Sequence, residues 1–160
     1  MKCLRNAAMI AALSLILFPI TAAEANPAGM FQVLDGVWRG TGRVELSGGN
    51  QQRIACKAYY TVKDSGSGLG FAIRCAAPSN KFELRGLVNE TNGRLSGTWE
   101  ERTYNAIGKV TGRAKSGQVA LSIAGTVNGS MKISFNNNRQ QVSISTATEG
   151  LKSISINLRR

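Results

Sequence analysis

The sequence predicts an all-β protein, an up-and-down antiparallel β-barrel of about eight to ten strands. Three observations predict it. Short runs of alternating apolar and polar residues are separated by Gly, Asn and Ser, and long helical periodicity is missing. Folding the chain at those turns also places apolar residues opposite apolar residues on one face. A sheet of this size is expected to close, because closure removes exposed strand edges. A β-sandwich of the same strands is the alternative.

The first segment is a targeting signal rather than part of the barrel. Lys2 and Arg5 precede an apolar run over residues 7–20, and residues 23–25 then read Ala-Glu-Ala. This order of basic, apolar and small residues is typical of a secretory signal peptide. We therefore expect a signal peptide over residues 1–25, with an uncleaved N-terminal anchor as the alternative.

The remaining chain divides into a lead-in over residues 26–34 and a single barrel domain over residues 35–160. No second long apolar run follows, so we expect no transmembrane segment in the mature chain. Export predicts a periplasmic or secreted location. In such an oxidising compartment Cys56 and Cys75 are expected to form a disulfide, and a reactive thiol is the alternative.

The hairpin that contains these two cysteines has the clearest alignment. Along an antiparallel pair of strands, the residue numbers of any two facing residues add up to the same value. The correct alignment is the one whose value places apolar residues opposite apolar residues on one face. Around the turn Asp64-Ser65-Gly66-Ser67, one alignment satisfies this at every inward position: Cys56–Cys75, Ala58–Ile73, Tyr60–Phe71 and Val62–Leu69.

The same reasoning divides the chain into about ten strands, which together form a sheet with one continuous apolar face. The other turns are predicted at residues 48–50, 78–80, 92–93, 105–106, 116–117, 127–129, 138–139 and 148–150. The predicted facing pairs include Trp38–Tyr60, Val44–Ile54, Gly86–Trp99, Trp99–Gly112, Glu101–Val110, Val110–Ile123, Leu121–Phe135, Ile133–Ile144 and Val142–Ile156.

Gly36-Val37-Trp38 opens the first predicted strand, after a lead-in that contains Phe31 and Leu34. A Gly-x-Trp at the start of an up-and-down barrel resembles the calycins, the superfamily of lipocalins, fatty-acid-binding proteins and avidins. Bacterial metalloprotease inhibitors share this barrel, an export signal and one disulfide. The resemblance implies that the Trp packs near the base of the barrel against an Arg of the closing strand, for which Arg159 and Arg160 are the candidates.

The chain also departs from the lipocalin pattern. It has no helix after the barrel, about ten predicted strands where lipocalins have eight, and no second or third lipocalin motif. The resemblance therefore leaves the ligand class open.

Four aromatic residues and one carboxylate are the candidate ligand-binding residues: Trp38, Tyr60, Phe71, Trp99 and Glu101. Glycines beside Trp99 leave room for its indole, which is either core packing or a platform for a ligand. Glu101 is the one carboxylate predicted well inside a strand on the inward face. Because burying an unpaired carboxylate is costly, it either reaches solvent at the barrel mouth or orients a polar group of the ligand.

The composition argues against an enzyme. The 160 residues include no His, which excludes His-based triads and His metal sites, and three Cys are too few for a four-cysteine zinc site. The serines have no candidate base beside them. We predict no catalytic residue, no metal site and no cofactor.

Positive charge dominates the chain. It holds 20 Lys and Arg against 9 Asp and Glu, a formal net charge of +11, mostly on the outward face of the predicted strands. This surface favours anionic partners such as lipopolysaccharide, acidic glycans or membrane head groups, or it serves solubility alone. Nucleic acid is not an expected partner, since an exported chain with few aromatics offers no outward stacking row.

Two functions remain. The first is an exported, non-enzymatic barrel that binds a small apolar or amphipathic ligand in its interior. The second is a cell-envelope interaction protein or protease inhibitor that acts through its loops or its basic outer face. Small inward residues such as Gly40, Gly97 and Gly112 either make space or accommodate the two Trp side chains. The interior volume therefore discriminates between the two functions.

Overall fold

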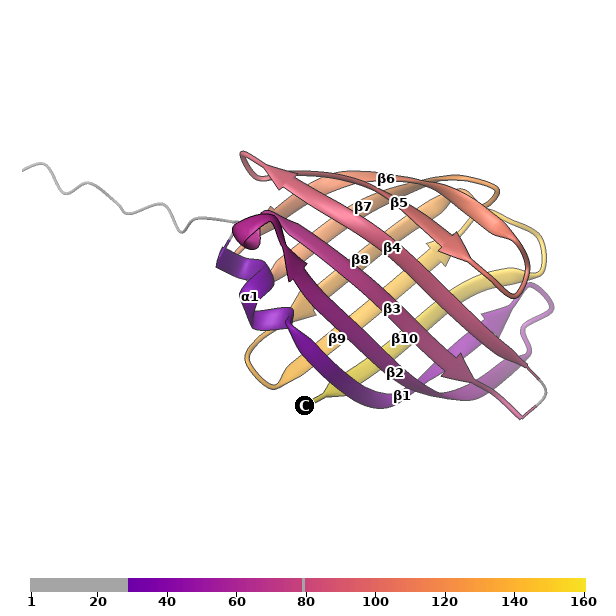
Figure 1. Cartoon of the computed structure of the whole chain (residues 1–160). Helices are drawn as coiled ribbons and strands as arrows, with labels where there is room; N and C mark the ends of the chain where they lie inside the picture. Colours follow the sequence, from indigo (N-terminus) through magenta and orange to yellow (C-terminus); the bar gives the residue numbers. More distant parts are fainter. Residues whose placement is uncertain (1–28, 79) are drawn as a thin grey trace, which may run out of the picture.

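The chain forms a closed antiparallel β-barrel, shown in Figure 1. The computed structural model describes residues 29–78 and 80–160, and the predicted signal peptide lies outside them. Each strand of this part pairs with the next along the chain, and β10 pairs with β1. The barrel prediction is therefore confirmed over the sandwich. The elements are α1 (Met30–Leu34), β1 (Gly36–Leu46), β2 (Gln51–Lys63), η2 (Asp64–Gly66), β3 (Gly68–Ala76), β4 (Lys81–Thr91), β5 (Arg94–Glu101), β6 (Ala106–Lys115), β7 (Gln118–Gly125), β8 (Gly129–Phe135), β9 (Arg139–Thr146) and β10 (Leu151–Arg159).

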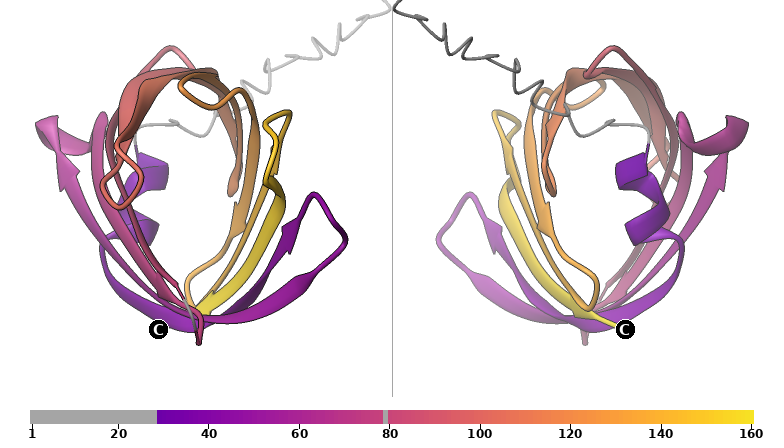
Figure 2. Two further views of the ribbon diagram at one scale, coloured as in Figure 1. Left: turned by 90° about the vertical axis from the view of Figure 1, so that its right-hand side faces the viewer. Right: turned by 90° about the vertical axis from the view of Figure 1, so that its left-hand side faces the viewer.

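The two ends of the barrel differ. The turns that follow β2, β4, β6 and β8 lie at one end together with α1, which we call the closed end. The loops that follow β1, β3, β5, β7 and β9 lie at the other end, which we call the mouth. Figure 2 views the ring of strands from each end, with α1 inside its outline. This helix packs against β2 and carries the fully buried Phe31 and Leu34.

Closure of the ring requires a close approach between the first and last strands. Gly40 of β1 faces Leu158 of β10. A Cβ atom at Gly40 would lie 1.8 Å from the backbone oxygen of Asn157, so no other residue fits there without moving β10. Glycine at such an inward position has no side chain, so the backbone of the neighbouring strand can approach closely.

Four hairpins have the predicted alignment. Cys56 faces Cys75, and the two form a disulfide with Cα atoms 4.1 Å apart, as predicted. The other confirmed pairs are Gly86–Trp99, Val110–Ile123 and Val142–Ile156. Two of these hairpins turn on Asn-Gly and Ser-Gly dipeptides, whose residues all have positive φ. Such dipeptides favour two-residue turns and thereby determine the register.

Four other alignments were wrong by two or four residues. Between β1 and β2, Trp38 faces Ala58 instead of Tyr60, and Val44 faces Gln52 instead of Ile54. Between β5 and β6, Trp99 faces Gly108 instead of Gly112, and Glu101 faces Ala106 instead of Val110. Leu121 of β7 faces Met131 instead of Phe135, and Ile133 of β8 faces Val142 instead of Ile144. Because side chains alternate with a period of two, every even shift leaves each residue on its predicted face.

Side chains that organise the loops account for two of these shifts. The backbone N–H of Tyr104 donates to Glu101 Oε2 at 2.7 Å, and Asn105 has a φ of 53°, which widens the loop between β5 and β6. After β8, the N–H groups of Asn138 and Arg139 donate to Asn136 Oδ1 at 3.1 and 2.9 Å. Both are local side-chain-to-backbone bonds that compete with a tight turn.

Candidate functional site: an apolar cavity open at the mouth

The barrel interior contains a cavity of about 470 Å³. Inward side chains from all ten described strands line it, and most are aliphatic or aromatic. Phe31 and Leu34 of α1, each only 1% exposed, form its floor at the closed end. Apart from Tyr60, its polar lining residues lie near the mouth. This volume lies within the range of about 300–1,000 Å³ that is typical of small-molecule sites.

Two aromatic side chains of the cavity wall lie over glycines of neighbouring strands. A Cβ atom at Gly86 would lie 2.4 Å from Cζ of Phe71, and a Cβ atom at Gly108 would lie 2.6 Å from Nε1 of Trp99. Both rings line the cavity. Gly86 therefore accommodates the Phe71 ring, and Gly108, rather than the predicted Gly112, accommodates the Trp99 indole. The Trp99 indole nitrogen is buried and has no hydrogen-bond partner among the described residues.

Tyr60 supplies the deep polar group of the cavity wall. Its hydroxyl donates to Gln140 Oε1 at 3.0 Å, and Gln140 Nε2 lies 2.8 Å from the same hydroxyl oxygen. β1 and β10 separate the two strands on the sheet, so this pair spans the interior. Burial raises the pKa of Tyr60 above its ordinary value of 10.0, and the hydrogen bond to Gln140 partly offsets this rise. Sequence reasoning missed Gln140, although a polar residue in phase with Val142 and Ile144 was the available signal.

Trp38 lies beneath the cavity floor and is not among the lining residues. It is 0% exposed, and its indole N–H donates to the Leu34 carbonyl at 2.8 Å. The Arg160 guanidinium lies 4.6 Å from the centre of the indole ring. Arg160 Nη2 also donates to the carbonyls of Val33 and Asp35. The expected pairing of this Trp with an Arg near the base of the barrel is confirmed for Arg160. The structure thus separates Trp38 from the other candidate residues.

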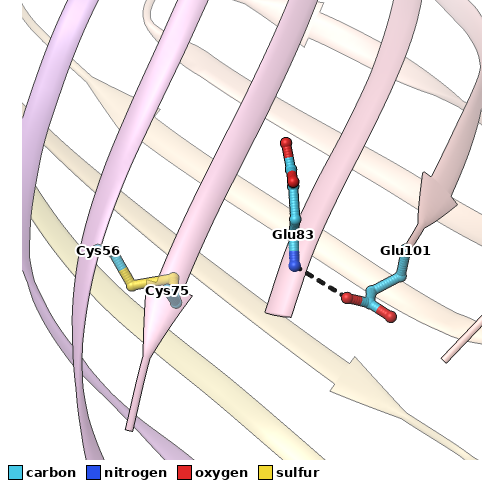
Figure 3. Close-up of a disulfide and its surroundings, with 4 residues drawn as sticks. All are labelled: Cys56, Cys75, Glu83 and Glu101. Carbon is cyan, nitrogen blue, oxygen red and sulfur yellow. Dashed lines mark hydrogen bonds between the residues drawn. A yellow bond between two sulfur atoms is a disulfide. The ribbon is translucent and has the colours of Figure 1, made fainter. Parts of the chain in front are cut away.

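Glu101 lines the cavity at the mouth. Its Oε1 accepts the backbone N–H of Glu83 at 2.9 Å, drawn in Figure 3, and its Oε2 accepts the N–H of Tyr104. These bonds supply the partners that a half-buried carboxylate needs. A role in orienting a ligand stays a prediction. Glu101 is not the one inward carboxylate, because Glu90 also faces inward and is 8% exposed. Glu90 accepts the backbone N–H of Gly93 at the closed end.

Two further mouth residues were missed. Tyr104, which is 65% exposed, and Glu149 both contribute to the cavity lining. Both belong to loops between strands, where the alternation of inward and outward positions does not apply. A sequence pattern with period two therefore carried no signal for them.

The outer face carries the basic residues. The Lys57 ammonium and the Arg74 guanidinium lie 4.9 and 5.4 Å from the centre of the Tyr59 ring. A hydrogen bond from Lys57, together with the positive charge of Lys57, Arg74 and Arg39, lowers the pKa of Tyr59. Glu83 pairs with Arg74 at 3.0 Å and with Arg85 at 2.6 Å, and these hydrogen bonds lower its pKa. Binding of an anionic envelope component or a protein at this face stays a prediction.

Within residues 29–78 and 80–160, no group of three or more His, Cys, Asp or Glu side chains is placed to hold a metal ion. In the same part of the chain, no helix has the length and apolar character needed to span a bilayer.

Comparisons with known proteins identify the fold. No family model matches the sequence, and no curated protein matches it. The crystal structure of Rv2717c from M. tuberculosis is similar, with a TM-score of 0.69 and 12% sequence identity over 86% of this chain and 98% of that chain. The S-type phycobiliprotein lyase CPES from Guillardia theta has a TM-score of 0.41 and 9% identity over 81% and 90% of the two chains. With its closed antiparallel ring, the chain has the fold of a calycin-like small β-barrel.

Proposed function

We propose that this chain is an exported, non-enzymatic β-barrel protein that binds a small apolar or amphipathic ligand in its interior. One observation carries the proposal: the cavity of about 470 Å³ is lined mainly by apolar side chains and is floored by α1. A core filled by its own side chains leaves few voids larger than a water molecule. Retention of so large an apolar space supports a role in binding.

The chemistry of the carboxylate at the mouth supports a non-enzymatic role. Glu101 is a half-buried carboxylate of the cavity lining, the kind of side chain that an acid–base mechanism would use. Both of its oxygens accept backbone N–H groups, from Glu83 and Tyr104, so the carboxylate holds the β5–β6 loop in shape. A group bound in this way is poorly placed to accept and release protons during turnover.

The disulfide between Cys56 and Cys75 supports export, because such bonds persist mainly in oxidising compartments. Sequencing the N-terminus of the protein recovered from its native cells tests this part of the proposal. A chain that begins at Asn26 is expected. A retained N-terminal segment in the mature protein contradicts it.

Binding of Nile red, a neutral dye that fluoresces in apolar surroundings, tests the interior site. The dye is expected to bind at one molecule per chain, and fatty acids, sterols or porphyrins that enter the cavity are expected to displace it. Trp99 lines the cavity, so its fluorescence should also change on binding. Absence of binding across the whole panel rejects the proposal.

A pair of matched variants tests whether the dye binds in the interior or on the outer face. Ala106 is buried in the cavity wall, whereas Ala120 lies on the outer face of β7. Ala106→Phe is expected to weaken dye binding at least about tenfold by filling the space, and Ala120→Phe to leave it unchanged. Circular dichroism confirms that both variants are folded. Equal binding by the two variants contradicts an interior site.

A further inference from the structure

The cavity lining carries a charge opposite to that of the whole chain. The chain holds 20 Lys and Arg against 9 Asp and Glu. Among the described residues that line the cavity, however, Glu101 and Glu149 are the charged side chains, and none is Lys or Arg. A carboxylate head group that entered the cavity would therefore meet no cation in its lining.

The polar lining residues also define a direction for the ligand. The floor is Phe31 and Leu34, and the deep hydroxyl of Tyr60 is already bonded to Gln140. The other polar side chains of the lining belong to loops or strand ends at the mouth: Gln52, Asn80, Glu101, Tyr104, Thr146, Thr148 and Glu149. An amphiphile is therefore expected to enter with its apolar end first and to leave its head group at the mouth.

Two groups at the mouth suit a positively charged head. The hydrogen bond from the Tyr104 N–H to Glu101 keeps an exposed aromatic residue on the same loop as a carboxylate. Aromatic faces and carboxylates both stabilise ammonium groups. The Glu149 carboxylate makes no hydrogen bond or ion pair within the described part of the chain, so it is available to a ligand.

The basic outer face does not cancel this local preference. At physiological ionic strength the Debye length is about 8 Å, so exposed cations further away than that are largely screened. The nearby cations Arg102 and Lys152 are paired with Glu100 at 3.9 Å and with Glu45 at 2.9 Å. Glu101 and Glu149 are therefore the charges that a head group meets in the cavity lining itself.

We propose that the mouth selects amphiphiles with a cationic head group. For one alkyl chain, the ammonium binds more tightly than the alcohol, and the alcohol more tightly than the carboxylate. This inference rests on the proposed function, since it concerns ligands held in the same cavity.

Displacement of bound Nile red by dodecylammonium, dodecanol and dodecanoate tests the order. The experiment uses physiological ionic strength, so that distant cations of the outer face are screened, and concentrations below micelle formation. Because the dye is neutral and reports on the interior, adsorption of dodecanoate to the basic outer face does not register. Dodecylammonium is expected to displace the dye at concentrations about tenfold lower than dodecanoate, with dodecanol between them. Dodecanoate or dodecanol that displaces it as well as dodecylammonium overturns the selectivity but leaves the proposed function standing. A dye that does not bind overturns both.

Two charge reversals separate a local effect from a global one. Glu149→Lys reverses a carboxylate of the lining, and Glu100→Lys makes the same change of net charge on the outer face of β5, where Glu100 is exposed and lies 3.9 Å from Arg102. Glu149→Lys is expected to reduce the preference for dodecylammonium over dodecanoate about tenfold, and Glu100→Lys to leave it unchanged. Equal changes in the two variants would assign the preference to net charge and overturn the proposal.

Discussion

The closed end and the mouth are formed by the same strands but differ in how completely their side chains are buried. At the closed end Trp38, Phe31 and Leu34 are at most 1% exposed. Near the mouth Val44 and Leu151 are only partly buried. Trp38, Val44 and Leu151 all point inward from strands, whereas Phe31 and Leu34 belong to α1. The strand pattern is therefore the same at both ends, and the helix supplies the extra side chains that pack the base, while the rim has no such cover among the described residues and leaves the cavity accessible.

The polar groups at the two ends also differ, in whether their hydrogen-bond partners connect separate elements. At the closed end the Trp38 indole, the Tyr60 hydroxyl and the Arg160 guanidinium each have partners that join separate elements. At the mouth Glu101 bonds within and beside its own loop, and Glu149 has no partner in the described part of the chain. We therefore expect substitutions at the closed end to change stability, and substitutions at the mouth to change binding.

The largest effect is expected for Trp38→Ala. Removing a fully buried indole leaves a void between α1 and the barrel, and such changes cost about 3–5 kcal/mol. Urea unfolding followed by circular dichroism measures the loss. Trp38→Phe keeps most of the apolar volume but removes the hydrogen bond to Leu34, so it should cost much less. A loss below about 1 kcal/mol for Trp38→Ala would contradict the stabilising role of this contact.

The next largest effect is expected for Tyr60→Phe. The change leaves the buried amide of Gln140 without its partner, at a cost of about 1–3 kcal/mol. The variant also tests a pH dependence. Because the folded pKa of Tyr60 is raised, the neutral phenol contributes stability that is present below pH 10.0 and is lost as the pH rises above it.

Unfolding measured at neutral and alkaline pH separates the two parts of this prediction. The wild-type chain should lose more stability above pH 10.0 than Tyr60→Phe does. Tyr104→Phe, at an exposed position of the mouth, is the matched control and should follow the wild type. An identical alkaline loss in Tyr60→Phe and wild type would show that the buried phenol does not govern it.

A smaller effect is expected for Arg160→Ala. It removes the contact with the Trp38 ring and the bonds to the Val33 and Asp35 carbonyls, worth about 1 kcal/mol at an exposed site. Arg159→Ala removes the same charge from the neighbouring residue and should change stability by less than about 0.5 kcal/mol. Chemical denaturation of both variants gives the comparison. Equal losses would assign the effect to net charge instead of to the contact with Trp38.

The smallest effect on stability is expected for Glu149→Gln at the mouth. This exposed loop residue has no partner among the described residues, so the free energy of unfolding should change by less than about 0.5 kcal/mol. The same variant should still weaken displacement of Nile red by dodecylammonium. A large loss of stability with unchanged binding would reverse the division of roles between the two ends.

The sequence by itself determined which face each strand residue occupies. Register errors of two or four residues did not move Trp38, Trp99 or Glu101 to the other face, because the side-chain period along a strand is two. It also determined the hairpins that turn on Asn92-Gly93 and Ser116-Gly117, since positive φ at both turn residues leaves one tight geometry.

Only the tertiary structure decided the contacts that depend on loop shape and ring closure. The loop held by Glu101 places Gly108, rather than Gly112, beneath the Trp99 indole. Closure through β1 and β10 brings Gln140 to Tyr60 across the interior. Such non-local distances set whether the interior is filled or hollow, because alternation along a strand specifies direction and carries no information on the diameter of the ring.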